Sequence, residues 1–392
     1  MSVLTINAGS SSIRFAFYDT STPPKKLLDG KIQRIGFDDT GMVVHETAGD
    51  SRRLALDARE RRSAGAFLMN WLEAHPLFAT LESVGHRVVH GMSHARPERV
   101  TSELLAELKR ITPYDPEHLP REIELMEAVS RKFPQLAQVA CFDTAFHRGM
   151  PRVATLLPIP RRYESRGVQR YGFHGLSYTY LLQELARRGD PAASRGRVIL
   201  AHLGNGASLA AVRDGKCIDT SMGFTPAAGL VMSTRSGDLD PGVMSFLALT
   251  EGMSAQAYWN MVNHEAGLLG VSETSSDMRD LLARERTDER AQEAVALFCY
   301  QAKKWVGAFA GALGGLDTVV FAGGIGENAA PVRARICEGL EFLGIELHAQ
   351  RNAQHASIVS SDASKVAVRV IPTDEESVIA MSTMETLAPK AE

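Results

Sequence analysis

Residues 3–18 read VLTINAGSSSIRFAFY, and this stretch decides the fold. Its two ends are apolar and rich in β-branched and aromatic residues, which is typical of strands. The central NAGSSS consists of small residues that favour turns. The stretch therefore predicts two strands joined by a tight turn.

A second copy of this pattern begins near the middle of the chain. Residues 198–212 read VILAHLGNGASLAAV, which is again a strand, a turn of Gly, Asn and Ser, and a returning strand. Residues 213–216 then supply the Asp-Gly pair of a hairpin turn. The repeat predicts an internal duplication, with one copy opening each half of the chain.

A third stretch follows a different pattern. Residues 318–328 read TVVFAGGIGEN, a short buried-type strand and a glycine-rich loop, and a helix is predicted from about 331 to 340. This arrangement places a ligand at a helix N-terminus. Its spacing fits neither the dinucleotide fingerprint nor the P-loop. One such loop is equally typical of an ordinary turn, but three together resemble the phosphate clamp of the actin, Hsp70 and sugar-kinase superfold.

Length and composition predict a two-domain α/β protein. The chain has 392 residues, which is more than one hydrophobic core usually holds. Strand patterns alternate with helical patterns, the latter at 64–75, 117–133, 177–188, 255–264 and 289–313. We expect an N-terminal domain of residues 1–148, with 378–392 packing back on it. Residues 149–377 are expected to form a C-terminal domain for nucleotide binding and dimerisation.

The bulk properties exclude several classes of partner. A net charge of −3 gives no reason to expect nucleic acid, and no apolar run has the length of a membrane span. No signal peptide is visible, and the four cysteines are too far apart for a disulfide framework or a zinc motif. A cytoplasmic protein with no membrane partner is expected.

Charged residues stand where predicted strands meet turns. They are Arg87 in GHRVVHG, Asp143 in FDTAFH, His174 in RYGFHG, Arg235 in STRSGD and Glu375 in PTDEE. Each alone is more typical of a structural role, because acidic residues favour a helix start and strand arginines are usually paired. Together they are what phosphoryl transfer needs, with cations for the phosphoryl oxygens and carboxylates for Mg²⁺.

These motifs, with NAGSSS, HLGNGAS, SDMRD and GGIGEN, occur in an order that resembles the acetate kinase family from residue 5 to about 380. The resemblance implies two ribonuclease H-like domains of the acetate/sugar kinase, Hsp70 and actin superfold. It implies reversible transfer of a phosphoryl group from ATP to acetate, which gives acetyl phosphate and ADP by in-line attack of the carboxylate. It also implies Mg²⁺ or Mn²⁺ as cofactor and a homodimer.

The resemblance further implies which residues form the site. Those implied to act on the transferring group are Arg87, Asp143, His174 and Arg235. Those implied to contact ATP are Ser10, Ser12, Arg14, His202, Leu203, Gly204, Asn205, Gly206, Asp277, Met278, Arg279, Gly323, Gly324, Ile325, Gly326 and Glu327. The acid is expected at Arg87, Val89, Glu117, Phe173 and Pro226, and the metal ion at Asn7 and Glu375.

Three positions depart from the family pattern. Arg14 stands where the family usually has Lys, and Ser177-Tyr178 replaces the usual Ser-His. Glu117 in DPEHLP replaces the Leu of APLHNP, which lines the pocket for the methyl group of the acid. A kinase for propionate or another short, polar acid is therefore an alternative.

Two further alternatives belong to other classes. A non-catalytic nucleotide-dependent switch of the same superfold would need the nucleotide loops but not Arg87, Arg235 and His174, so their joint presence favours an enzyme. A sugar kinase is disfavoured because two arginines suit an anionic acceptor. A carboxylate is already ionised at neutral pH and needs no general base.

Overall fold

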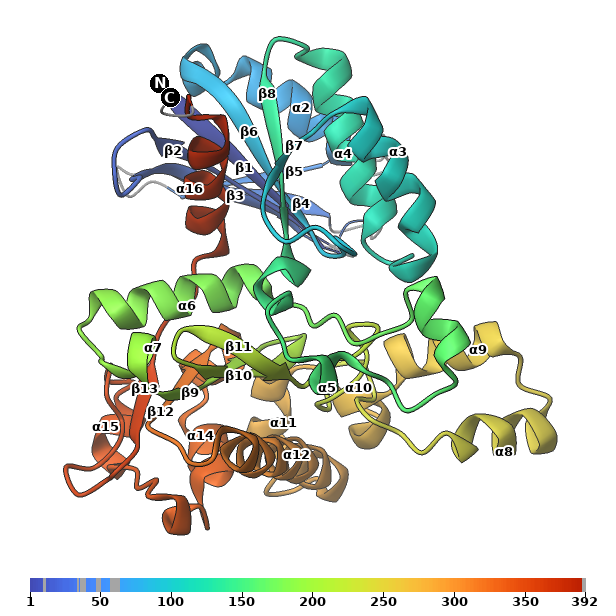
Figure 1. Cartoon of the computed structure of the whole chain (residues 1–392), viewed down its shortest axis with the longest axis vertical. Coiled ribbons are helices and arrows are strands. Elements are labelled where there is room, and N and C mark those ends of the chain that lie inside the picture. The colour runs from blue at the N-terminus through green and yellow to red at the C-terminus, as the bar shows by residue number, and fades with distance from the viewer. Residues whose placement is uncertain (10–11, 34, 36–39, 47–50, 57–63, 390–392) are drawn as a thin grey trace. The chain divides into compact units, whose positions relative to one another are not determined.

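The computed structural model describes residues 1–9, 12–33, 35, 40–46, 51–56 and 64–389, and it divides the chain into two compact units (Figure 1). The first unit comprises Met1–Ala145 and Asp374–Glu392, and the second comprises Phe146–Thr373. No helix among the described residues is both long and apolar enough to cross a membrane.

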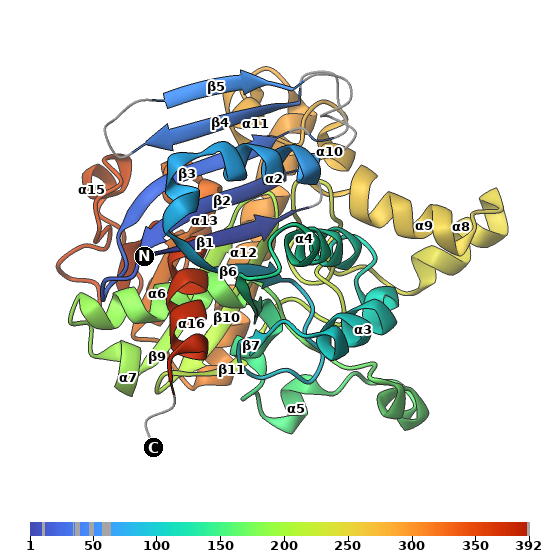
Figure 2. The ribbon, with the colours of Figure 1, turned by 90° about the horizontal axis from the view of Figure 1, so that it is seen from above.

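The first unit is built on a mixed sheet that has, among the described residues, the strand order β5-β4-β3-β2-β1-β6-β8-β7 (Figure 2). The strands are β1 Ser2–Ala8, β2 Ser12–Asp19, β3 Lys26–Gln33, β4 Gly41–Glu46, β5 Ser51–Ala55, β6 Leu81–Val88, β7 Glu98–Arg99 and β8 Ala137–Phe142. β1 pairs antiparallel with β2, which confirms the first predicted strand pair. On its other side β1 pairs parallel with β6, and β6 pairs parallel with β8.

Helices pack on both faces of this sheet. They are α2 Ala64–Ala74, α3 Ser102–Ile111, α4 Leu119–Lys132 and α16 Glu375–Leu387, with 3₁₀ turns at Pro76–Thr80, Thr112–Tyr114 and Asp143–His147. Side chains alternate along β2, as expected of a strand. Phe15 and Phe17 join the core that α2 and α4 cover, whereas Ala16 and Tyr18 pack with Ala380 of α16.

The second unit repeats the strand order of the first. Its described strands are β9 Arg197–Leu203, β10 Ala207–Arg213, β11 Lys216–Thr220, β12 Thr318–Ala322 and β13 Ala367–Val370, in the order β11-β10-β9-β12-β13. β9 pairs antiparallel with β10 and parallel with β12, and β12 pairs parallel with β13. The same relations hold for β3-β2-β1-β6-β8, so the predicted duplication is confirmed.

The helices of the second unit are α5 Arg152–Thr155, α6 Gly175–Arg187, α7 Ala192–Arg195, α8 Gly242–Glu251, α9 Ala255–Asn260, α10 Gly267–Ser272, α11 Met278–Arg284, α12 Glu289–Leu313, α13 Gly323–Asn328, α14 Ala330–Cys337 and α15 Ala349–Ala353. Arg161–Arg166 and Glu341–Leu343 are 3₁₀ turns, and Met261–Glu265 is a π turn. α6 buries Tyr178, Leu181 and Leu185 in one core with residues of β9 and β10. This packing brings the start of α6 to the hairpin.

The structure differs from the sequence prediction at residues 323–328. They were expected to form a loop, but they form the short helix α13 directly after β12. Gly323 makes this turn possible, because its φ is +76° and a Cβ there would lie 2.7 Å from the carbonyl oxygen of Leu203. α9 also ends at Asn260, four residues before the predicted end, because the π turn follows it.

Candidate active site

Polar residues mark one edge of the first sheet. Asn7 lies near the end of β1, Arg87 lies near the end of β6, and Asp143 follows β8 directly. Because these strands are parallel neighbours, their C-terminal ends lie together. Glu375 opens α16 at the same edge, where the Asn7 Nδ2 group donates to Glu375 Oε2 at 2.9 Å and to Glu376 Oε1 at 3.3 Å. The first unit therefore brings together four residues predicted for the site.

The guanidinium of Arg87 links this cluster. Its Nη2 and Nε groups donate to Asp143 Oδ2 at 2.6 Å and 3.2 Å, and its Nη1 group donates to Asn7 Oδ1 at 3.1 Å. Burial opposes the charge of the guanidinium, but Asp143 and then Glu375 outweigh burial and raise the pKa of Arg87. Arg87 is thus a permanent positive charge with a fixed orientation.

The acidic end of the cluster has the donor chemistry of a magnesium site. Burial raises the pKa of Glu376, and the neighbouring charge of Glu375 raises it further. A cation relieves such crowding of carboxylates. No group of three or more His, Cys, Asp and Glu side chains in the described part of the chain is arranged to hold a metal ion. Mg²⁺ at phosphoryl-transfer sites usually takes only one or two carboxylates, with water and phosphate oxygens as its other ligands, so these residues fit the ion.

The nucleotide residues predicted in the first unit belong to the β1–β2 pair. Arg14 lies opposite Asn7 in the ladder, and its charge acts on Glu376. Ser12 opens β2, and its carbonyl oxygen accepts the N–H of Gly9 at 2.8 Å. Ser10 lies outside the described residues.

A buried carboxyl group that the sequence did not single out lies beside Val89. Both Glu122 oxygens lie 3.2 Å from the Val89 backbone N–H, which donates to them, and Glu122 is 2% exposed. Burial, and then the charge of Asp115, raises the pKa of Glu122 well above its ordinary value. Glu117 lies in the turn before α4 and is partly buried, and Val89 is buried.

The second unit brings two predicted histidines together. His174 precedes α6 and His202 lies on β9, and their rings stack with centroids 4.3 Å apart. His174 Nδ1 and Ser208 Oγ share a hydrogen bond of 2.8 Å, as do His202 Nδ1 and Ser177 Oγ. His174 has a φ of +59°, a conformation that costs about 1–3 kcal/mol for a residue with a side chain. Such strain is typical of functional positions.

The turn between β9 and β10 approaches both His174 and Arg235. A Cβ at Gly206 would lie 2.8 Å from Arg235 Nη2 and 3.1 Å from His174 Nε2. Arg235 Nη1 also donates to the carbonyl oxygen of Pro226 at 2.7 Å. The turn residues Leu203, Gly204 and Asn205 complete the hairpin, which a bond of 3.0 Å from the Gly204 N–H to the Gly206 carbonyl oxygen closes. Glycine at 206 therefore leaves room for two predicted catalytic side chains.

Side-chain contacts hold α13 at both ends. Glu327 Oε1 accepts the N–H groups of Gly323 at 2.9 Å and Thr373 at 3.2 Å. Arg333, which is fully buried, donates to the carbonyl oxygens of Gly326 and Glu327 at 2.8 Å and 2.9 Å. Arg333 was not predicted, because an arginine in a helical segment gives no sign of long-range contacts. The helix contains all five predicted residues from Gly323 to Glu327, including Gly324 and Ile325.

The remaining predicted residues of the second unit lie on separate elements. Asp277 caps α11 by accepting the Arg279 N–H at 2.8 Å, and the two side chains form an ion pair at 2.6 Å. The Arg279 side chain is 89% exposed, whereas Met278 is buried. Phe173 is also buried, and its carbonyl oxygen is bonded to His147 Nε2 at 2.9 Å.

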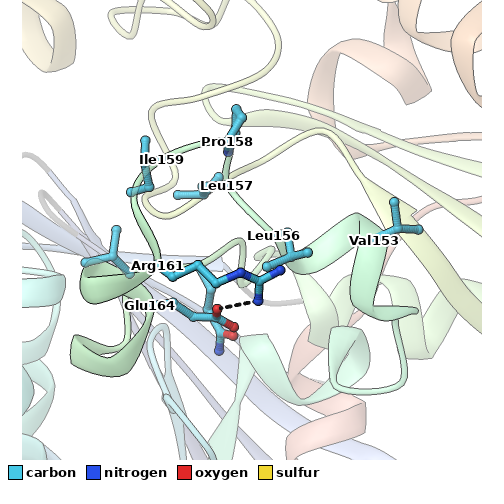
Figure 3. A pocket seen from close by; sticks show the side chains of 9 residues that line it. Val153, Leu156, Leu157, Pro158, Ile159, Arg161 and Glu164 are labelled. Carbon is cyan, nitrogen blue, oxygen red and sulfur yellow. Dashed lines mark ion pairs between the residues drawn. The ribbon is translucent and has the colours of Figure 1, made fainter.

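A hollow of about 340 Å³ in the second unit has no predicted site residue in its described lining (Figure 3). It is lined by Val153, Leu156, Leu157, Pro158, Ile159, Arg161, Glu164, Val168 and Gln169. Arg161 and Glu164, which lie in the same 3₁₀ turn of this lining, form an ion pair at 3.6 Å. The candidate site is thus defined by hydrogen-bonded clusters rather than by this hollow.

The two α/β units share one strand order, and each has polar side chains at the ends of its parallel strands. The model of the acetokinase family matches residues 2–381, and the chain belongs to that family. An acetate kinase from Phocaeicola vulgatus is 40% identical, over 99% of this chain and 100% of its own length. A propionate kinase from Citrobacter rodentium is 41% identical, over 97% of this chain and 96% of its own length.

The crystal structure of Porphyromonas gingivalis acetate kinase has the same fold. It superposes with a TM-score of 0.89 at 36% identity, over 99% of this chain and 100% of that one. The predicted fold class and family are both confirmed.

Replacing Gly206 with alanine is expected to lower activity with little loss of stability. The added methyl group displaces the Arg235 guanidinium and the His174 ring, which are ends of side chains and can move without unfolding the unit. We expect at least a tenfold fall in turnover, because small displacements of catalytic groups are costly. Gly204→Ala should lose clearly less turnover than Gly206→Ala, because a Cβ at Gly204 would meet no atom closer than 3.4 Å. Turnover and melting temperature are measured for both variants. Equal losses of turnover in the two variants would contradict this geometry.

Proposed function

We propose that this chain catalyses reversible transfer of the γ-phosphoryl group of ATP to acetate, with acetyl phosphate and ADP as products. The observation that carries the proposal is the acetokinase family match over residues 2–381, in a chain that retains Arg87, His174 and Arg235. Relatives of about 40% identity over their full length are acetate kinases. A non-catalytic switch would have no use for these three side chains.

The proposed reaction needs charge neutralisation rather than a base. An oxygen of the ionised acetate attacks the γ-phosphorus, a new O–P bond forms, and the bond to the bridging oxygen of ADP breaks as ADP leaves with the electron pair. No proton has to be removed from the acceptor. Two anions approach each other, so fixed donors and cations aimed at the transferring group lower the barrier most.

Each unit supplies part of the proposed set. We assign Arg87 to the carboxylate and the transferring phosphoryl, with Asp143 and Asn7 fixing its orientation. We assign Arg235 and His174 to the phosphoryl oxygens, beside the Gly206 turn. The nucleoside is assigned to residues 277–279 and 323–327. Mg²⁺ or Mn²⁺, proposed to bind at Asn7 and Glu375, supplies further charge neutralisation for the phosphate oxygens.

Propionate or another short acid is the second candidate substrate. The propionate kinase of C. rodentium is as similar to this chain as the acetate kinases are. Glu117 also places a carboxyl group where the family pattern has Leu, which favours a polar acid.

We propose that the chain acts as a homodimer. Helix α8 supports this, because it is apolar and none of its residues is buried. Phe246 and Leu249 on this helix are 63% and 87% exposed. Exposed apolar surface of this kind is typical of interfaces. Light scattering should give a mass near twice 42.6 kDa, and a monomeric mass at micromolar concentration would contradict the proposal.

Removing either proposed catalytic arginine should abolish most turnover. Arg87→Ala and Arg235→Ala are each expected to lower kcat by about 10²-fold, because each removes a charge acting on the transferring group. The assay traps the acyl phosphate with hydroxylamine, in the presence of ATP, Mg²⁺ and a panel of short acids.

Arg351→Ala is the matched control for these variants. It removes an arginine whose partner, Asp362, is 86% exposed, and it should leave kcat unchanged. Near wild-type turnover in Arg87→Ala or Arg235→Ala would refute the role of that residue. Absence of ATP-dependent hydroxamate with every acid would refute the enzymatic proposal.

Glu117→Leu is expected to shift specificity toward unsubstituted acids. A carboxylate beside the acid site repels the substrate and disfavours an apolar methyl group, whereas leucine restores an apolar contact. The ratio of kcat/KM for acetate or propionate to that for hydroxylated or amino-substituted acids should rise, by about tenfold if the change is near 1.4 kcal/mol. An unchanged ratio would place Glu117 outside the acid pocket.

A further inference from the structure

A buried hydrogen-bonded chain reaches His174 from behind. Ser208 Oγ bonds to His174 Nδ1 at 2.8 Å on one side and to the Tyr178 hydroxyl at 2.5 Å on the other. Ser208 and Tyr178 are both fully buried. The chain therefore runs from a phenol through a serine to one nitrogen of the imidazole.

The local fold explains why these three side chains meet. Tyr178 lies one helical turn after His174, and its backbone N–H donates to the His174 carbonyl oxygen at 3.0 Å. Ser208 lies on β10, opposite His202 on β9, in the hairpin on which α6 packs. The helix and the hairpin together hold the chain of hydroxyl groups in place.

The single proton of the Ser208 hydroxyl couples its two neighbours. If Tyr178 donates to Ser208, then Ser208 donates to His174 Nδ1. The imidazole is then neutral and carries its proton on Nε2. If His174 carries a proton on Nδ1 instead, Ser208 accepts it and must turn its own proton toward Tyr178. The phenol therefore influences which nitrogen of His174 is protonated.

The other nitrogen of His174 faces the proposed chemistry. A Cβ at Gly206 would lie 3.1 Å from His174 Nε2 and 2.8 Å from Arg235 Nη2, so both groups point at the same turn. Arg235 and the stacked ring of His202 are among the titratable or charged groups near His174 in the second unit. Because Arg235 is always charged, a second positive charge on His174 is unfavourable. The same charge also disfavours an Nε2–H group in the resting protein, so the hydrogen bond from Ser208 to Nδ1 has to set the tautomer. A neutral ring with an Nε2–H group is still a donor.

We propose that Tyr178 is a positioning residue that acts through Ser208 to hold His174 as the neutral Nε2–H tautomer, so that this N–H donates to an oxygen of the transferring phosphoryl group. This inference rests on the proposed function for its catalytic consequence only. The tautomer itself is a property of the resting protein.

The side chain at position 178 is a phenol rather than a second imidazole. A phenol keeps its proton throughout the neutral range, whereas an imidazole gains one near neutral pH. Tyrosine at this position therefore always has a proton to donate to Ser208 across that range, and Ser208 can then donate to His174 Nδ1.

The direct test is ¹⁵N NMR of the wild-type protein with labelled histidine. The His174 signals are assigned by their loss in His174→Gln. At neutral pH we expect a neutral ring that is protonated on Nε2. A His174 ring protonated on Nδ1, or on both nitrogens, would overturn the proposal. This test needs neither a variant of Tyr178 nor an activity measurement.

Tyr178→Phe tests the catalytic consequence. Without the phenol, Ser208 is free to accept from Nδ1, so the tautomers should mix and the ring should gain its second proton more easily. We expect the acid limb of the kcat–pH profile to move to higher pH, and kcat to fall about tenfold with little change in KM. Ser208→Ala removes the intervening hydroxyl and should have the same effects.

Tyr171→Phe is the matched control. It removes another buried phenol of the same segment, whose hydroxyl donates to the Gly167 carbonyl oxygen at 2.7 Å. It should leave the His174 signals and the pH profile unchanged. If folded Tyr178→Phe keeps the wild-type kcat–pH profile and the wild-type His174 tautomer, the proposal is overturned. It is also overturned if Tyr171→Phe changes the profile and the tautomer as Tyr178→Phe does. If the wild type forms no acyl phosphate, the proposed function fails, and the NMR result still decides the tautomer.

Discussion

Parallel strand pairing is the constraint on which the Arg87 cluster and the polar end of β9 depend. In the first unit β1, β6 and β8 run parallel, so Asn7, Arg87 and Asp143 meet at one edge of the sheet. In the second unit β9 and β12 are parallel neighbours, and His202 and Gly323 lie at their C-terminal ends. Ligands of α/β proteins bind beyond such strand ends. The repeated strand order therefore gives each unit its own polar edge.

Fixed orientation of charge is the second common feature of the clusters. Arg87 is held by an ion pair and an amide oxygen from different strands, so its planar guanidinium has one orientation. His174 is held by a strained backbone and by Ser208. Donors that are already oriented need little rearrangement as charge develops, which is how proteins stabilise a transition state most effectively. The cost of burying Arg87 is offset by Asp143 and Glu375.

Local sequence signals predicted the hairpins and the α/β class, because strand alternation and turn residues are read within a few positions. They missed α13, since its glycines favour a loop. Glu327 holds the helix by accepting the N–H groups of Gly323 and of the distant Thr373, and Arg333 donates to the Gly326 carbonyl oxygen. Ser208 and Glu122 were also missed, and Tyr178 was noted only as a departure from the family pattern. Ser208 is an ordinary strand residue in sequence. Glu122 has the spacing of the buried face of α4, three residues after Leu119 and four before Met126, but a carboxylate is usually exposed. Their hydrogen bonds join distant segments, and one sequence gives no sign of such pairs.

Direct attack of a carboxylate oxygen on the γ-phosphorus is the step that all the proposed roles serve. ³¹P NMR with acetate labelled with ¹⁸O at both carboxyl oxygens tests it, because ¹⁸O bonded to phosphorus shifts the phosphorus resonance. With ATP, Mg²⁺ and this protein, we expect an acyl-phosphate signal that carries the shift of one bridging ¹⁸O. An acyl-phosphate signal without that shift, or no ATP-dependent signal from acetate or any other labelled short acid, would contradict direct attack.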